Sequence, residues 1–131
     1  MKTQKWITWT VRVLLAAAFL AAGTSKLTGG EQMVAAFEKI GLGQWFRYLT
    51  GAIEVGAALL LLIPATGFAA SLLLLATMVG AIITHVFVIG GNPAPAIVLG
   101  VLAGFVAWRT NPFAAAAAQA AAIRQGRTRA A

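Results

Sequence analysis

The stretch 67–89, GFAASLLLLATMVGAIITHVFVI, decides the fold class. Its 23 residues include no Asp, Glu, Lys or Arg, and His85 is its one titratable side chain. A helix needs about 20 apolar residues to cross the hydrocarbon layer of a bilayer, which is roughly 30 Å thick. The stretch also lacks the strict alternation of apolar and polar residues that is typical of membrane-embedded strands. We therefore expect a transmembrane helix here.

Three further apolar runs flank this stretch, at residues 7–27, 48–63 and 93–108. The last three of the four runs are separated by short links rich in Gly and Pro, which are helix-ending residues. Short links favour antiparallel neighbours. The sequence therefore predicts an all-α integral membrane protein, with an antiparallel bundle of four transmembrane helices over residues 1–110.

The long first link, residues 28–47, and the C-terminal segment, residues 111–131, have a different character. In the link, Met33, Phe37 and Ile40 alternate with charged residues, a pattern typical of a short amphipathic helix on a membrane surface. The C-terminal segment is rich in Ala and ends in three basic residues, Arg124, Arg127 and Arg129. We expect a cytoplasmic tail there, either helical or disordered.

The composition excludes several classes of protein. Of the 131 residues, 60% are apolar and 10% charged, whereas soluble domains are nearer half and a quarter. A soluble domain of this length could not bury such an excess. The chain has no Cys, which excludes disulfides, thiol chemistry and thiolate metal sites. Three Glu and one His offer few other metal ligands, so no metal site is predicted.

The net charge of +7 does not indicate nucleic-acid binding, because the basic residues flank apolar runs instead of sharing one face of a polar domain. Lys and Arg are enriched on the cytoplasmic side of membrane proteins. The flanks near the two termini carry six of them, and the first link with its edges carries three, Lys26, Lys39 and Arg47. We therefore expect both termini in the cytoplasm. A cleaved signal peptide at 7–27 is the alternative, and Arg12 within that run opposes it.

Four polar residues within or at the edge of the apolar runs are the candidate functional residues. A charged group in hydrocarbon costs at least about 2.5–3.5 kcal/mol on insertion scales. A rise of about 1.5 Å per residue places Lys26 at the outer boundary, with Glu54 about 9 Å and His85 about 6 Å below it. We expect these three to converge in one outward-facing pocket. Arg12 shares the helix face of Lys26 but lies near the inner side, out of reach of Glu54.

Each of these residues also has a structural interpretation. Arg12 and Lys26 are then interfacial anchors, Glu54 and Lys26 form a clamp, and His85 is a hydrogen-bonded packing residue. Small residues also recur at every fourth position, as at Ala96, Gly100 and Gly104. Such rows permit close helix approach, either inside the bundle or between two copies of the chain in a homo-oligomer.

The sequence resembles the DoxX family of small bacterial membrane proteins over about residues 10–110. The resemblance is carried by Arg12-Val13-Leu14-Leu15 with Phe19, Gly23 and Lys26, by Gly51-Ala52-Ile53-Glu54-Val55-Gly56-Ala57, by Pro64 and by His85. It implies a four-helix bundle in the bacterial inner membrane, linked to redox chemistry. Relatives include a subunit of a thiosulfate:quinone oxidoreductase, and more distant ones act as assembly chaperones or cargo receptors. The lack of Cys argues against a thiol relay in this chain.

Three functions follow, and the sequence leaves open whether the chain is catalytic. The first is a quinone-linked redox or accessory subunit that works with a separate electron-donating partner. Glu54 and His85 are then the candidate catalytic residues, and Lys26 and Arg12 the candidate cofactor-binding residues. The second is a non-catalytic scaffold, anchor or assembly chaperone for another protein. The third is a small proton-coupled transporter, which the absence of inverted repeats disfavours.

Overall fold

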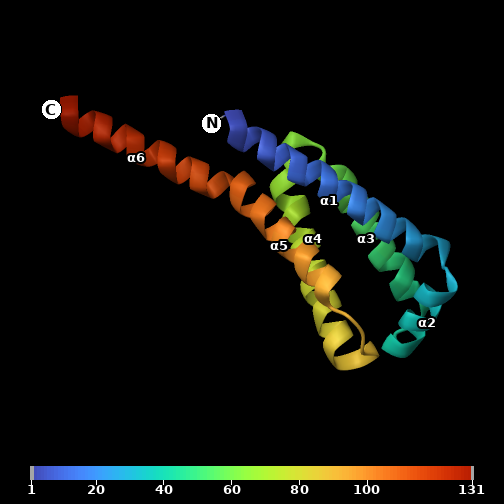
Figure 1. The fold of residues 1–131 in the computed structure, drawn as a ribbon. Helices are drawn as coiled ribbons and strands as arrows, with labels where there is room; N and C mark the ends of the chain where they lie inside the picture. The colour runs from blue at the N-terminus through green and yellow to red at the C-terminus, as the bar shows by residue number, and fades with distance from the viewer. Residues whose placement is uncertain (1, 131) are drawn as a thin grey trace.

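The computed structural model describes residues 2–130, and it is helical along almost its whole length (Figure 1). Within these residues there is no strand. The helices are α1 (Lys2–Thr28), α2 (Glu31–Ile40), α3 (Gln44–Leu61), α4 (Gly67–Thr84), α5 (Ala94–Thr110) and α6 (Pro112–Ala130). A short 3-10 turn, η1 (Pro64–Thr66), precedes α4, and a π-helical turn, η2 (His85–Ile89), continues it. The predicted all-α class is confirmed.

Helices α1, α3, α4 and α5 pack around one another. α1 lies beside α3 and α4 beside α5, and contacts of α3 with α4 and of α1 with α5 close the ring. The two pairs are close where α1 begins and diverge toward α2, which contacts α3 and η2 at the other end (Figure 1). α1 begins and α5 ends at the same end of the bundle, and α6 leads away from it.

Three stretches of the described chain are long and apolar enough to cross a membrane: Lys2–Thr28, Pro64–Ile89 and Ala94–Ala130. They contain three of the four predicted spans. α3 covers residues 48–61 of the fourth predicted span, 48–63, and completes the ring, but its own sequence is less apolar because it holds Gln44, Arg47 and Glu54. The structure thus supports an all-α membrane protein, and the count of four spans stays a prediction.

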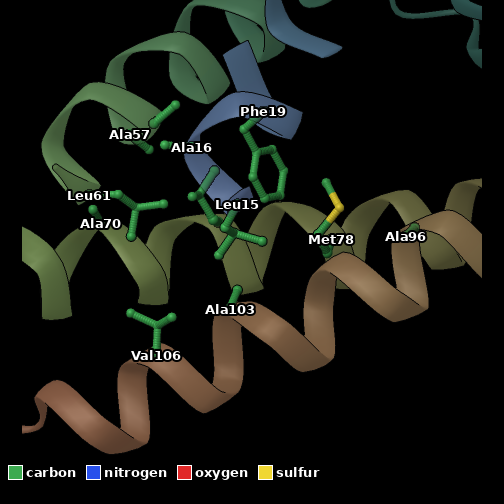
Figure 2. Packing of buried hydrophobic residues seen from close by; sticks show 12 residues of the cluster. Leu15, Ala16, Phe19, Ala57, Leu61, Ala70, Met78, Ala96, Ala103 and Val106 are labelled. Carbon is green, nitrogen blue, oxygen red and sulfur yellow. The ribbon is translucent and has the colours of Figure 1, made fainter. Parts of the chain in front are cut away.

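The core lies where the four helices of the ring meet (Figure 2). Its largest apolar side chains are fully buried and come from all four helices: Leu15 and Phe19 from α1, Leu61 from α3, Leu74 from α4 and Val106 from α5. In α1 the buried positions recur three or four residues apart, so one face of that helix looks into the bundle.

α1 and α3 approach closely where Gly23 faces Gly51. A Cβ atom on Gly23 would lie 2.7 Å from Val55 Cγ2 and 2.9 Å from the Gly51 carbonyl oxygen. A Cβ atom on Gly51 would lie 3.0 Å from the Gly23 carbonyl oxygen. Neither position has room for a side chain, and small residues at a crossing are what allow two backbones to come this close. Lys26 and Glu54 each lie one turn from the crossing, on α1 and α3, and the close approach of the two helices lets their side chains meet.

Arg12 joins the same two helices near the opposite end of α1. Its guanidinium is buried and donates from Nε to the Leu61 carbonyl at 2.7 Å and from Nη2 to the Ile63 carbonyl at 2.9 Å. It also lies 4.3 Å from the centre of the Trp9 ring. The last carbonyls of a helix have no partner within the helix, so Arg12 caps α3. It is a buried cap here, and the interfacial-anchor interpretation of Arg12 is wrong.

Two boundaries differ from the sequence expectation for physical reasons. α3 starts at Gln44, earlier than the predicted 48, because the chain breaks at Gly43, whose φ of 99° favours glycine. It ends at Leu61 because Pro64 forces the preceding Ile63 into an extended conformation. The predicted amphipathic helix in the first link is α2, and the alternative of a helical tail is observed as α6.

We predict that Gly23→Ala destabilises the protein by about 1–3 kcal/mol, because a methyl group at the crossing forces α1 and α3 apart. Gly56→Ala is the matched control on α3, since a Cβ there meets nothing within 4 Å. It should stabilise the protein by up to about 1 kcal/mol through helix propensity. Thermal unfolding of the two variants in one detergent measures the difference. Equal melting temperatures would show that the crossing is not tightly packed.

Candidate functional site

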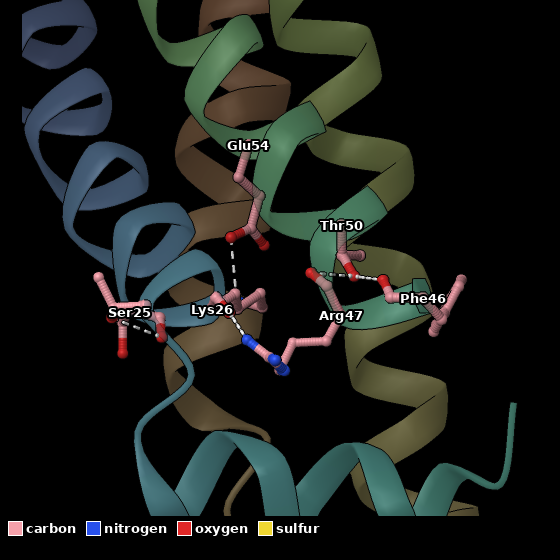
Figure 3. Close-up of polar contacts among 7 residues, drawn as sticks. Ser25, Lys26, Phe46, Arg47, Thr50 and Glu54 are labelled. Carbon is pink, nitrogen blue, oxygen red and sulfur yellow. Dashed lines mark hydrogen bonds and ion pairs between the residues drawn. The ribbon is translucent and has the colours of Figure 1, made fainter. Parts of the chain in front are cut away.

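An ion pair between α1 and α3 forms the centre of the site (Figure 3). Lys26 Nζ donates to Glu54 Oε2 at 2.9 Å. The Glu54 side chain is 2% exposed and that of Lys26 17% exposed, so the carboxylate is enclosed while the ammonium keeps an accessible side. A buried carboxylate requires a partner of opposite charge. Lys26 supplies it because the Gly23–Gly51 crossing lies one turn away.

Arg47 supports this pair from the first turn of α3. Its side chain is buried; Nη1 donates to the backbone carbonyl of Lys26, and Nε donates to Gln44 Oε1 at 2.7 Å. Gln44 in turn donates from Nε2 to the Val34 carbonyl of α2 at 3.1 Å. Arg47 thereby connects the start of α3 to the end of α1 and, through Gln44, to the short helix α2.

The role of Arg47 was not predicted from the sequence, in which it counted only as an orientation charge. The spacing of residues in the sequence did indicate that Arg47 is buried. Arg47, Gly51 and Glu54 are spaced four and three residues apart, which places them on one face of a helix. All three are buried on the face of α3 that packs against its neighbours. Arg47 therefore shares the face of α3 that carries Glu54.

His85 stands at the junction of α4 and the π turn η2. Its Nδ1 lies 2.8 Å from the Ala81 carbonyl oxygen, one turn earlier in α4. A carbonyl can only accept, so Nδ1 carries the proton in this contact. The turn of π helix was not predicted; such turns occur frequently at functional sites in helices. It ends at Gly90, whose φ of 61° breaks the helix.

A cavity of about 540 Å³ lies between the diverging helices, and Lys26, Glu54 and His85 all line it. α2 contributes the apolar side chains of its inner face, Met33, Phe37 and Ile40 among them. α1, α3, α4 and α5 supply the rest of a largely apolar wall, with Thr50, Thr77 and Thr84 as its other polar members. The described chain thus lines a partly open apolar space with one ammonium, one carboxylate and one imidazole on its walls.

The structure therefore brings three of the four predicted residues to one cavity, as their depths indicated. Arg12 is separate: it lies fourteen residues before Lys26 on α1, about 21 Å along the axis, and caps α3. Among residues 2–130 no group of three or more His, Cys, Asp or Glu side chains is close enough to hold a metal ion. The donors and acceptors at the cavity suit hydrogen bonding to a small head group and proton exchange with it.

The ion pair predicts unequal costs for removing its two members. Lys26→Met leaves the enclosed carboxylate without a partner and should cost about 3 kcal/mol, the lower end of the range for a broken buried pair. Glu54→Gln should cost less, because the ammonium has an accessible side. The double variant should be more stable than the sum of the two single effects predicts, with a coupling of at least about 1 kcal/mol. Additive losses in detergent unfolding would contradict a direct pairing.

Comparisons with known proteins were made on the whole chain. No curated protein and no solved structure matches it. Among protein families, the one described as the DoxX-like family matches residues 10–110, which cover α2 to α5 entirely and α1 from its third turn. The match contains the α1–α3 crossing, the ion pair and the cavity, and it leaves out the whole of α6. On this match, the chain belongs to the DoxX-like family.

Proposed function

We propose that this protein is a membrane-embedded accessory subunit that binds a quinone and works with a separate electron-donating protein. The observation that carries the proposal is the cavity of about 540 Å³, apolar on most of its wall and fitted with Lys26, Glu54 and His85. A quinone has the same division of properties, with a polar ring and an apolar tail. The fold alone does not favour this function over others, so the proposal rests on the cavity.

The residues present fit such a ligand. The cavity volume lies within the range of roughly 300–1,000 Å³ that is usual for small-molecule sites. An ammonium has three N–H donors, and the bond to Glu54 uses one of those on Lys26. The others are free to donate to a carbonyl oxygen of a quinone ring. The apolar side chains of α2 and of the bundle would accommodate the tail.

Protons and electrons would come from different sources. Reduction of a quinone to a hydroquinone consumes two electrons and two protons. Glu54 and His85 line the cavity and would exchange the protons with the ring oxygens. The chain has no Cys and one His, so it offers no thiolate ligands for a redox centre of its own. We propose that a separate protein supplies the electrons.

The orientation proposed from the charges fits the shape of the bundle. α1 begins and α5 ends at one end, where Lys2, Lys5 and Arg109 lie, and α6 with its three arginines leads away from that end (Figure 1). This is the end that we assign to the cytoplasm. α3 would be the fourth transmembrane span, and the cavity would then lie toward the opposite surface of the bacterial inner membrane.

Quinone binding tests the proposal directly. The intact protein in detergent should bind a benzoquinone with a decyl tail saturably. Lys26→Met should weaken binding about tenfold or more, because a hydrogen bond to a charged group contributes about 1.5–3 kcal/mol. Lys39→Met is the matched control, since Lys39 lies exposed on α2 and outside the cavity. The proposal fails if the wild-type protein shows no saturable binding, or if the two variants bind equally.

Helix α6 supports the proposal of a protein partner. All of its residues from 112 to 130 are exposed, and its last two turns carry Arg124, Arg127 and Arg129 with no acidic residue in the helix. Apart from an edge-to-face contact of Phe113 with Phe68 of α4, this basic helix is exposed, and its basic end suits an acidic surface on another protein. The same helix would serve the alternative function of a scaffold or anchor.

Replacing Arg124, Arg127 and Arg129 together by Gln should abolish co-purification of the partner from native membranes in a mild detergent. Affinity for the decyl benzoquinone should stay unchanged, because α6 does not line the cavity. A partner that remains bound to the triple variant would mean that α6 is not the docking element. Loss of quinone affinity in the same variant would contradict the independence of the two sites.

A further inference from the structure

We infer that the cavity selects a head group that donates a hydrogen bond to His85, and hence binds a hydroquinone more tightly than the corresponding quinone. This inference rests on the proposed function and concerns which redox form of the ligand the site prefers. It follows from the hydrogen bonds of a single imidazole ring.

The first step is the tautomer of His85. Its Nδ1 lies 2.8 Å from the Ala81 carbonyl oxygen, and that oxygen has no proton to give. Nδ1 must therefore hold a proton. In a neutral imidazole the other nitrogen, Nε2, is then a bare acceptor. The contact is within the last turn of α4, so the helix itself sets the tautomer before any ligand is bound.

The second step is the availability of Nε2. Every buried side-chain nitrogen or oxygen within residues 2–130 has a hydrogen-bond partner. Nε2 of His85 has none in this part of the chain, so it is an accessible atom of a residue that lines the cavity. The edge of the ring that bears Nε2 lies beside Gly91: a Cβ there would be 3.5 Å from Cδ2. The acceptor is therefore held in place and left for a ligand.

The third step compares the two redox forms. Lys26 offers donors on α1, and His85 offers an acceptor at the end of α4. A quinone carries two carbonyl oxygens, which only accept; it satisfies Lys26 and presents a lone pair to Nε2. A hydroquinone carries two hydroxyl groups, which both accept and donate, so it satisfies Lys26 and His85 together. Leaving a polar group without its partner in a largely apolar site costs more than the bond itself contributes.

The expected preference is about tenfold in dissociation constant. This corresponds to one neutral hydrogen bond that the hydroquinone makes with His85, compared with the acceptor that the quinone leaves without a partner. A tenfold preference for the two-electron reduced form raises the reduction potential of the bound couple by about 30 mV. The site would thus favour the reduced ligand without any change in the protein's charges.

The test uses the full-length protein in detergent, with the decyl benzoquinone and, anaerobically, its hydroquinone as probes. The wild-type protein should bind the hydroquinone about tenfold more tightly. His85→Phe keeps a ring but removes both nitrogens, so it should bring the ratio of the quinone and hydroquinone dissociation constants close to one. Phe87→Leu is the matched control: it alters an exposed ring on the same π turn that does not line the cavity, and it should keep the wild-type ratio.

A spectroscopic measurement covers the case in which His85→Phe does not fold. His85 is the only histidine in the chain, so protein labelled with ¹⁵N-histidine gives the signals of one imidazole. Two signals of the Nδ1-protonated form are expected, and hydroquinone should shift the Nε2 signal more than quinone does. An Nε2-protonated ring, or equal affinities for both probes in the wild-type protein, would overturn the inference. Saturable binding of neither probe would instead overturn the proposed function.

Discussion

The enclosed carboxylate of Glu54 is the constraint that organises the bundle. A carboxylate with 2% of its side chain exposed must be neutralised, and Lys26 on α1 is the cation that reaches it. The pair can form only because Gly23 and Gly51 let the two backbones approach one turn away. The rotation and register of α1 against α3 are thereby fixed. Arg12 and Arg47 then hold the two ends of the same helix pair by donating to backbone carbonyls that lie at or near helix ends.

The two ends of the bundle differ in how closely the two helix pairs approach each other (Figure 1). Toward the Arg12 end, Leu15, Leu61 and Val106 fill the space between the four helices, and the pairs α1–α3 and α4–α5 stay together. Toward the other end the pairs diverge, and both small and large apolar side chains line the space between them. α2 covers the opening with the apolar face of a short amphipathic helix. The cavity thus lies where the two helix pairs diverge, with α2 packed against α3 and η2 beside it.

The parts that could be predicted from the sequence depend on one-dimensional patterns. Hydropathy located the helices, Gly and Pro located most of their ends, and simple depth along each helix brought Lys26, Glu54 and His85 together. The parts that could not be predicted depend on tertiary contacts with the backbone. Arg12 and Arg47 bind carbonyls 21 to 51 residues away in the chain, and no local pattern shows which carbonyls a fold leaves unpaired. The π turn at His85 likewise arises where α4 meets Gly90, not from helix propensity.

The backbone also determines what the site residues can do, which connects fold and chemistry here. The backbone of Lys26 is anchored by the bond of its carbonyl to Arg47, and its ammonium reaches Glu54 and the cavity as a donor only. His85 is held by the Ala81 carbonyl, which leaves an acceptor for a ligand. In His85 a main-chain contact therefore fixes which ring nitrogen accepts. A change that disturbs this contact would alter ligand selection, since hydrogen-bonding groups are selective only when their roles are fixed in advance.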